Sequence, residues 1–272
     1  MYKIFLSVRN RLAVTTKCVT ALTRHSKLPF QLYIYDNLSS TNIPERFMYY
    51  SILYQKGIAT QITFNTKEST YNAFSKAVTS NQFGRSHEED PRKTSYDFLV
   101  FLDNDIIVCP GWDEIFRNAW LDVKKQALTT VKIIGQNPGG IKFKNDLPQK
   151  VAGVKARLGK FGGSALWCVQ PNFFKDVGFL DIPMFLGIHK RHDQIYWQKL
   201  DKSTGGQNYI LGLDTTIGIH VGKYAGSICN VLSKTKDERS IEFRKQEEEI
   251  DKLSFDEFYS RIINDKELVK DW

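Results

Sequence analysis

Short apolar segments alternate with amphipathic ones along the first hundred residues of the chain. Apolar runs bounded by turn residues are typical of buried strands, and apolar positions three or four residues apart are typical of helices. The pattern predicts strands at residues 2–8, 31–35, 60–64 and 98–102, and helices at residues 12–25, between Asn42 and Gly57, and at 71–78. Because strands and helices alternate, we expect an α/β fold with a mostly parallel central sheet flanked by helices.

The second half of the chain is less regular. Residues 135–163 hold prolines, glycines and many lysines without a clear period, so a long functional loop is expected there. Strands are predicted at 164–169 and 215–220, and helices at 172–177, 193–200 and 237–263, the last with a break near Ser254. We expect one domain at residues 1–222, with a donor half to about residue 110 and an acceptor half at 111–222, followed by a closing loop and helical tail at 223–272.

Polar side chains stand where three of the predicted strands end. They are Ser7, Arg9 and Asn10 at the first strand, Asp36 and Asn37 at the second, and Asp103, Asn104 and Asp105 at the strand 98–102. In open parallel sheets, ligands bind beyond the carboxyl ends of the strands, so these side chains outline one site. The first strand is followed by no glycine-rich loop, which disfavours a dinucleotide-binding domain and a nucleotidyltransferase. For Asp36 and Asn37, a turn bonded to local backbone stays open as an alternative.

The segment Phe101-Leu102-Asp103-Asn104-Asp105-Ile106-Ile107 places two carboxylates one residue apart between apolar runs. Burying like charges so close together is costly unless a cation compensates them, and carboxylate oxygens are the ligands that Mg²⁺ and Mn²⁺ prefer. A tight turn capped by one aspartate is the alternative. The apolar flanks favour a divalent metal, Mn²⁺ or Mg²⁺, at Asp103 and Asp105.

The order of these motifs resembles the large family of inverting GT-A glycosyltransferases. The matching segments, in order, are Asp36 to Ser40 for the nucleotide-binding DNxS segment, Asp103-Asn104-Asp105 for the DxD motif, Pro110-Gly111-Trp112, Gly163 to Asp181, and His192-Asp193, where His192 replaces the usual glutamate. The resemblance covers about residues 1–222. It implies a GT-A fold and a metal-dependent transfer of a sugar from a nucleotide diphosphate donor, most commonly a UDP-sugar, to a hydroxyl group.

The resemblance also implies roles for individual residues. The donor nucleotide would contact Arg9, Asp36, Asn37, Asp103 and Lys223. The metal would be held by Asp105 and Asp103, with His220 as a third ligand, and Asp193 would be the general base that deprotonates the acceptor hydroxyl. A purely structural histidine at position 220 and a helix cap at position 193 stay open as alternatives.

Charge is unevenly distributed along the chain. Residues 237–272 carry a net charge of −5, whereas the rest carries +13, and residues 141–160 alone carry +5. The acceptor-side candidates are Lys155, Arg157, Lys160 and His192. A basic face indicates an anionic partner, although a solvated lysine-rich loop is the commoner fate of such a run.

The first hypothesis for the acceptor is therefore a hydroxymethylated pyrimidine in DNA, because the chain resembles phage-type DNA base glycosyltransferases. A saccharide or cell-surface glycan is the second. A non-catalytic module that binds nucleic acid or a glycan is the alternative from another class of protein.

Composition excludes several other classes of protein. The cysteines (Cys18, Cys109, Cys168, Cys229) form no CxxC pair, so neither a zinc ribbon nor a redox motif is indicated. Residues 1–8 are too short for a signal peptide, and no run reaches the roughly 18 apolar residues that a bilayer span requires. We expect a cytoplasmic protein without a membrane span.

Overall fold

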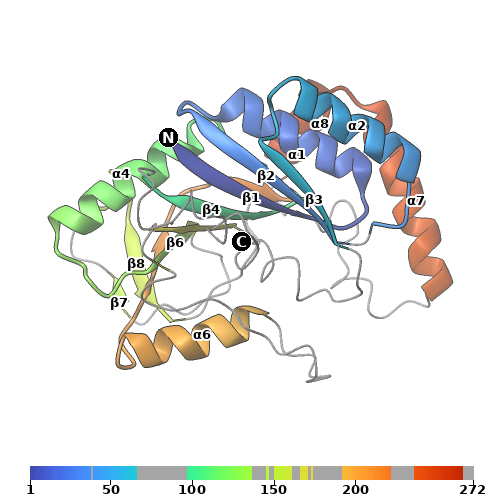
Figure 1. The fold of residues 1–272 in the computed structure, drawn as a ribbon. Helices are drawn as coiled ribbons and strands as arrows, with labels where there is room; N and C mark the ends of the chain where they lie inside the picture. Colours follow the sequence, from blue (N-terminus) through green and yellow to red (C-terminus); the bar gives the residue numbers. More distant parts are fainter. Residues whose placement is uncertain are drawn as a thin grey trace.

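The expected α/β architecture is confirmed in the computed structural model, which describes residues 1–37, 39–65, 97–136, 145–146, 150–160, 166–170, 173, 192–221 and 236–265 (Figure 1). A nine-stranded sheet has the order β3-β2-β1-β4-β9-β6-β10-β8-β7, and β11 and β5 form a separate two-stranded sheet. The strands are β1 (Tyr2–Val8), β2 (Phe30–Asn37), β3 (Gln61–Asn65), β4 (Leu99–Asp103), β5 (Ile106–Val108), β6 (Ile133–Gln136), β7 (Asn145–Asp146), β8 (Ala156–Gly159), β9 (Leu166–Val169), β10 (Ile210–Leu213) and β11 (Gly218–His220).

Most strands of the large sheet share one direction. β1 pairs in parallel with β2 and β4, β2 with β3, and β6 with β10. Of the strands in this sheet, β9 and β8 run the other way, and each pairs antiparallel with both of its neighbours. The carboxyl ends of β1, β2 and β4 therefore meet at one edge, as the sequence predicts.

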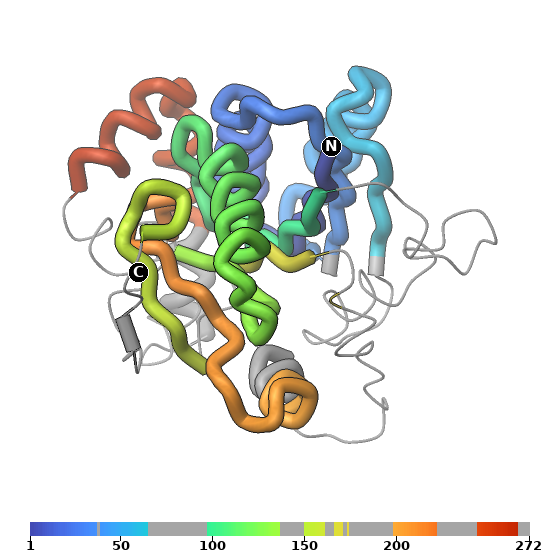
Figure 2. The backbone as a smooth tube through the Cα atoms, turned by 90° about the vertical axis from the view of Figure 1, so that its left-hand side faces the viewer, coloured from blue at the N-terminus to red at the C-terminus, as the bar shows by residue number. Residues whose placement is uncertain are grey.

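Helices cover both sides of this sheet. They are α1 (Leu12–His25), α2 (Ile43–Gln55), α4 (Trp112–Lys125), α6 (His192–Ser203), α7 (Lys236–Lys252) and α8 (Phe255–Asn264). Figures 1 and 2 show α1, α2, α4 and α8 on one side of the sheet and α6 on the other. Within the described residues, no helix is both long and apolar enough to cross a membrane.

The core lies between the sheet and the layer that contains α1. Alternate residues of β1, from Tyr2 to Val8, are buried against apolar positions of α1 such as Val14 and Leu22. The acidic tail joins the same core through Ile250, Phe258 and Ile262. Ser254 caps α8 with a reciprocal capping box to Glu257, which is where the sequence indicates a break.

The structure corrects the sequence-based elements in three places. Residues 135–163 contain the end of β6 and the strands β7 and β8, so the prediction of one long loop is wrong there; two- and four-residue strands are too short to show a period. The helix α4 and the strand β10 were not predicted. The helices predicted at 71–78 and, apart from Phe173, at 172–177 lie outside the described residues.

Candidate functional site

The middle residue of the Asp103-Asn104-Asp105 turn fixes this turn to the loop between β1 and α1. The Asn104 backbone N–H donates to the carbonyl of Ser7 at 3.0 Å. Its buried side chain donates from Nδ2 to Thr15 Oγ1 at 2.9 Å and to the carbonyl of Asn10 at 3.3 Å. A buried amide with both donor contacts made is expensive to displace, so the turn has one preferred position.

Asn10 extends this network to the loop after β2. Its backbone N–H donates to Ser39 Oγ at 2.7 Å, and its side-chain oxygen accepts the backbone N–H of Ser40 at 2.8 Å. Asn10 and Arg11 have φ values of 54° and 55°, in the left-handed region that non-glycine residues visit rarely. Three strand ends are therefore tied together through a strained loop, a feature that clusters at functional sites.

The carboxylate of Asp105 is the centre of the site. Its Oδ2 accepts a hydrogen bond from Arg11 Nη1 at 2.9 Å and lies 3.2 Å from His220 Nε2. His220 reaches this position because β11 pairs antiparallel with β5, with His220 opposite Ile106. The backbone N–H of Val221 also donates to the carbonyl of Asp105 at 2.9 Å.

The charge state of this pair follows from its surroundings. Burial alone raises the pKa of Asp105, but the hydrogen bond from His220 and the charges of His220 and Arg11 outweigh it and lower the pKa to about 2. For His220, burial lowers the pKa, and the hydrogen bond and charge of Asp105, with the charge of Asp103, outweigh that effect and raise it. Asp105 is therefore an anion at neutral pH.

The donor atoms present here fit a divalent cation. Asp105 Oδ2 and His220 Nε2 are 3.2 Å apart, and a carboxylate and an imidazole would be suitable ligands for a divalent cation. Within the described residues, no group of three His, Cys, Asp or Glu side chains is close enough to form a metal cluster. The structure thus brings together two of the three predicted ligands, and Asp103 lies near enough for its charge to act on His220.

Asp36 is placed at the same edge of the sheet but is engaged within the protein. The residue is 2% exposed. Its Oδ1 accepts the backbone N–H of Ser39 at 2.9 Å, and its Oδ2 accepts the hydroxyl of Tyr50 at 2.9 Å. Arg46 Nη1 lies 3.6 Å from Oδ2. Asp36 therefore supports the loop that begins at Ser39.

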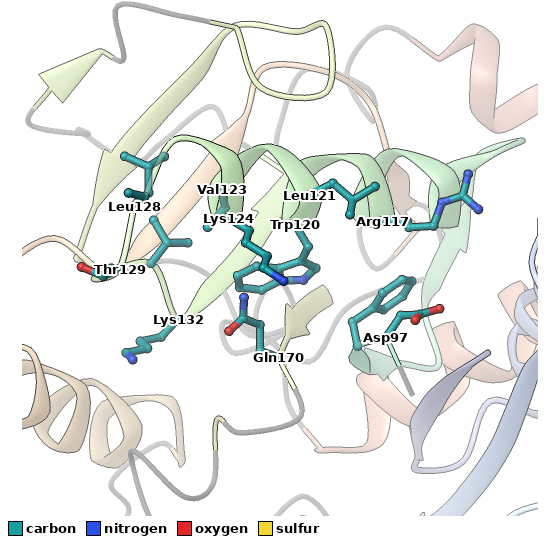
Figure 3. A pocket seen from close by; sticks show the side chains of 13 residues that line it. Asp97, Arg117, Trp120, Leu121, Val123, Lys124, Leu128, Thr129, Lys132 and Gln170 are labelled. Atoms are coloured by element: carbon teal, nitrogen blue, oxygen red, sulfur yellow. The ribbon is translucent and has the colours of Figure 1, made fainter. Parts of the chain in front are cut away.

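A pocket of about 780 Å³ adjoins Arg11. Its lining comes from the loop after β1, the start of α1, the start of α2 and the inner side of α7, and it includes the predicted donor contact Arg9. Glu247 of α7 accepts, through Oε2, the backbone N–H of Ala13 in the first turn of α1 at 2.9 Å. Arg11, the N-cap residue of α1, makes no side-chain capping bond, so Glu247 satisfies one of the N–H groups that a helix start leaves unpaired. A second pocket, about 840 Å³, lies beside α4 near the starts of β4 and β6, at the other end of these strands (Figure 3).

Several predicted site residues lie away from Asp105 or outside the described part. Arg157 Nη2 lies 3.6 Å from Asp214 Oδ2, and Lys160 Nζ lies 3.2 Å from Asp201 Oδ1, on or just after the peripheral strand β8. Lys155 precedes β8, and its carbonyl accepts the backbone N–H of Asp214. Lys223 lies outside the described residues, and so do the side chains of Asn37, His192 and Asp193. The backbone at His192 begins α6, as expected.

Two residues that contribute to the site were missed in the sequence: Arg11 and Glu247. Asn10 and Asn104 were expected at this edge of the sheet. Arg11 stands two positions after Arg9 at the same predicted strand end, so position alone could have indicated it. Glu247 carries no such signal, because its contact with Ala13 joins residues 234 positions apart.

The sequence matches no protein-family model and no curated protein. Among solved structures, GalNAc-T7 with UDP, GalNAc and Mn²⁺ has a TM-score of 0.52 at 12% identity, over 94% of this chain and 52% of that one. The mannosyltransferase PcManGT from Pyrobaculum calidifontis, with GDP-Man and Mn²⁺, has a TM-score of 0.49 at 15% identity, over 77% and 53%. S. aureus TarS 1-349 has 0.49 at 12% identity, over 90% and 71%.

This chain spans about half the length of GalNAc-T7 and PcManGT. At these identities the likeness concerns the fold alone. The strand order, the layers of helices and the likeness to GalNAc-T7 together identify the fold of this chain as GT-A.

Proposed function

We propose that the chain is a glycosyltransferase that moves a sugar from a nucleoside diphosphate donor to an acceptor hydroxyl. The observation that carries the proposal is the contact of Asp105 Oδ2 with His220 Nε2, at 3.2 Å, at the carboxyl edge of a GT-A sheet. The two residues are 115 positions apart in the chain, so this contact is a product of the fold rather than of local sequence.

The nucleotide part of the donor is proposed to lie in the pocket beside Arg11. Arg9 is exposed at its rim, where its charge can meet a phosphate or ribose oxygen. Asp36 serves this pocket by fixing the loop after β2, and a direct contact from Asp36 to the donor requires one of its oxygens to exchange its internal partner. Asn37, the next residue, is a further proposed donor contact. Lys223, which follows β11 closely, is a further proposed phosphate contact.

Asp105 and His220, with Asp103, are the residues proposed to hold the divalent cation, and an imidazole ligand favours Mn²⁺ over the oxygen-preferring Mg²⁺. When bound, the cation neutralises charge on the diphosphate leaving group. Asp193 is proposed to accept the acceptor's hydroxyl proton as the bond from that oxygen to the anomeric carbon forms and the bond to the diphosphate oxygen breaks. A single displacement of this kind inverts the anomeric configuration.

The acceptor is proposed to be a saccharide or other glycan. Two of the acceptor-side cations, Arg157 and Lys160, face Asp214 and Asp201, which reduces the charge they offer to a phosphate backbone. These two cations also lie far from Asp105, because β8 is four strand spacings from β4, roughly 19 Å at about 4.8 Å each. A hydroxymethylated pyrimidine in DNA is the second candidate, favoured by the net charge of +13 outside the acidic tail.

The test measures release of nucleoside diphosphate from a panel of UDP- and GDP-sugars, with Mn²⁺, with Mg²⁺ and with a chelator. We expect release from at least one donor that requires a divalent cation and is lost in Asp105→Asn. Asp256→Asn is the matched control, because Asp256 is 83% exposed and pairs with Arg24 far from the site.

A chain that binds a glycan or DNA but releases no diphosphate from any donor would be a non-catalytic binding module, and the proposal would be wrong. Mass spectrometry of acceptors, with glycans and hydroxymethylated DNA offered in parallel, separates the two acceptor classes.

A further inference from the structure

The helix α2 is apolar on its outer side as well as on its inner side. Its inner side buries Tyr50 and Leu53 against the sheet, together with Arg46. Its outer side exposes five large apolar side chains, each between 40% and 63% exposed: Ile43, Phe47, Met48, Ile52 and Tyr54. A surface helix of a globular protein normally has a polar outer face, and a helix that is apolar all round is normally covered on all sides.

The neighbouring strand extends this apolar face. Phe64 on β3 is 42% exposed, and its ring centroid lies 4.8 Å from that of Phe47. Within the described residues, nine large apolar side chains are exposed, and six of them belong to this one surface. We call the set Ile43, Phe47, Met48, Ile52, Tyr54 and Phe64 the α2 face. Contiguous apolar surface of this kind marks an interaction site rather than the usual scatter of single exposed residues.

The α2 face lies at the edge of the molecule, although the start of α2 adjoins the pocket beside Arg11, which Asn42 and Glu45 help to line. β3 is the terminal strand of the nine-stranded sheet in the described part of the chain, and Figures 1 and 2 show α2 and β3 at the periphery. Asp105 belongs to the turn after β4, two strands further in than β2. A partner on the α2 face would therefore not sit on Asp105.

We propose that the α2 face is the interface of a symmetric homodimer in which two copies of α2 pack antiparallel across a twofold axis. Exposed charges at the two ends of the helix specify this arrangement. Glu45 lies near the start of α2 and Lys56 at its end, so antiparallel helices place Glu45 of one protomer opposite Lys56 of its partner. The same register sets Phe47 against Tyr54, and a parallel pairing would set like charges together.

The residue nearest the centre of this arrangement is small. Ser51 is exposed and lies half-way between Phe47 and Tyr54 along the outer side of α2. A short side chain where two helices cross allows them to approach within the 8–10 Å usual for packed helices. The large side chains then fill the space on either side of the crossing.

The area of the α2 face is sufficient for a dimer. A fully exposed aromatic or comparable apolar side chain presents roughly 200 Å², so six such side chains about half exposed present about 600 Å². A specific interface buries about 800 Å² per partner, of which the apolar core is the larger part. Polar residues around the α2 face supply the remainder.

The test is sedimentation of the full chain over roughly 1 to 100 μM, for the wild type, Met48→Asp and the control Leu121→Asp. Leu121 on α4 is 59% exposed and Met48 63%, so the two changes add the same charge to equally exposed apolar positions. We expect a dimer for the wild type and for Leu121→Asp. In Met48→Asp the dissociation constant should rise roughly 100-fold or more, because a twofold interface contains each change twice.

Ser51→Cys provides a second measurement that does not weaken the interface. Under mild oxidation we expect a covalent dimer from Ser51→Cys and none from Leu121→Cys. A wild type that stays monomeric at all concentrations, or a Met48→Asp variant that dimerises as well as the wild type, would overturn the proposal. A monomer that co-floats with lipid vesicles, and loses this binding in Met48→Asp, would overturn it in favour of a membrane surface on the same face.

Discussion

Replacing Asn104 by alanine tests whether the middle of the DxD turn positions the site. The change removes two donor contacts of a buried side chain, to Thr15 Oγ1 at 2.9 Å and to the carbonyl of Asn10 at 3.3 Å. Each bond contributes about 1 kcal/mol, and the carbonyl left without a donor adds a further cost, so the free energy of unfolding should fall by about 2–3 kcal/mol. For a chain of this length, the melting temperature should fall by roughly 5–10 °C.

The assay pairs urea unfolding with diphosphate release at saturating donor. Asn264→Ala is the control, because Asn264 also donates from Nδ2, to the carbonyl of Ser260 at 2.8 Å, but at an exposed position. The free energy of unfolding of Asn264→Ala should differ from that of the wild type by less than about 0.5 kcal/mol. A displaced turn should also lower the turnover of folded Asn104→Ala, since Asp105 is the next residue. An Asn104→Ala variant as stable and as active as Asn264→Ala would refute the reasoning.

Three other predictions follow from single contacts. His220→Ala should raise the Mn²⁺ concentration needed for half-maximal diphosphate release, and an unchanged metal titration would remove His220 from the proposed ligand set. Burial raises the pKa of Glu247, so its negative charge destabilises the folded state once the pH rises above the ordinary glutamate range. Glu247→Gln keeps an acceptor for the N–H of Ala13 but carries no charge. In thermal unfolding it should therefore be more stable than the wild type at pH 7 but not at pH 4. Ser254→Ala should cost about 1 kcal/mol in urea unfolding through loss of the capping box, whereas the exposed Ser260→Ala should cost little.

Local patterns in the sequence were sufficient for the elements whose stability is local. The run at 2–8 is β1 to the residue, and the spacing at 12–25 is α1 to the residue, because each has a continuous apolar pattern of one period. Ser254 and Glu257, three residues apart, form the capping box that begins α8, so this helix start depends on local residues alone. The helix α4 also has local signals that were overlooked, with Asp113 and Glu114 in its first turn and Lys124 and Lys125 in its last.

Contacts between distant residues could not be predicted in this way. The pattern places Asp105 at a strand end, but it does not show that Arg11, 94 positions away, donates to its carboxylate. Nor does it show that Asp36, expected to face the donor, is held by Tyr50 and Arg46 from the following helix. In both cases the carboxylate's partner depends on how the loops pack, which hydrophobic periodicity does not record.

The pairing of β5 with β11 has a consequence for the order in which the molecule is assembled. β5 follows β4 directly, whereas β11 comes more than a hundred residues later, so this small sheet closes a very long loop. Contacts of such long range form after the local ones during folding, because the chain entropy lost on closure must be offset by structure already present. The imidazole of His220 is therefore expected beside Asp105 only at a late stage of folding, and a partly folded chain would have the aspartates in place without the third of the proposed metal ligands.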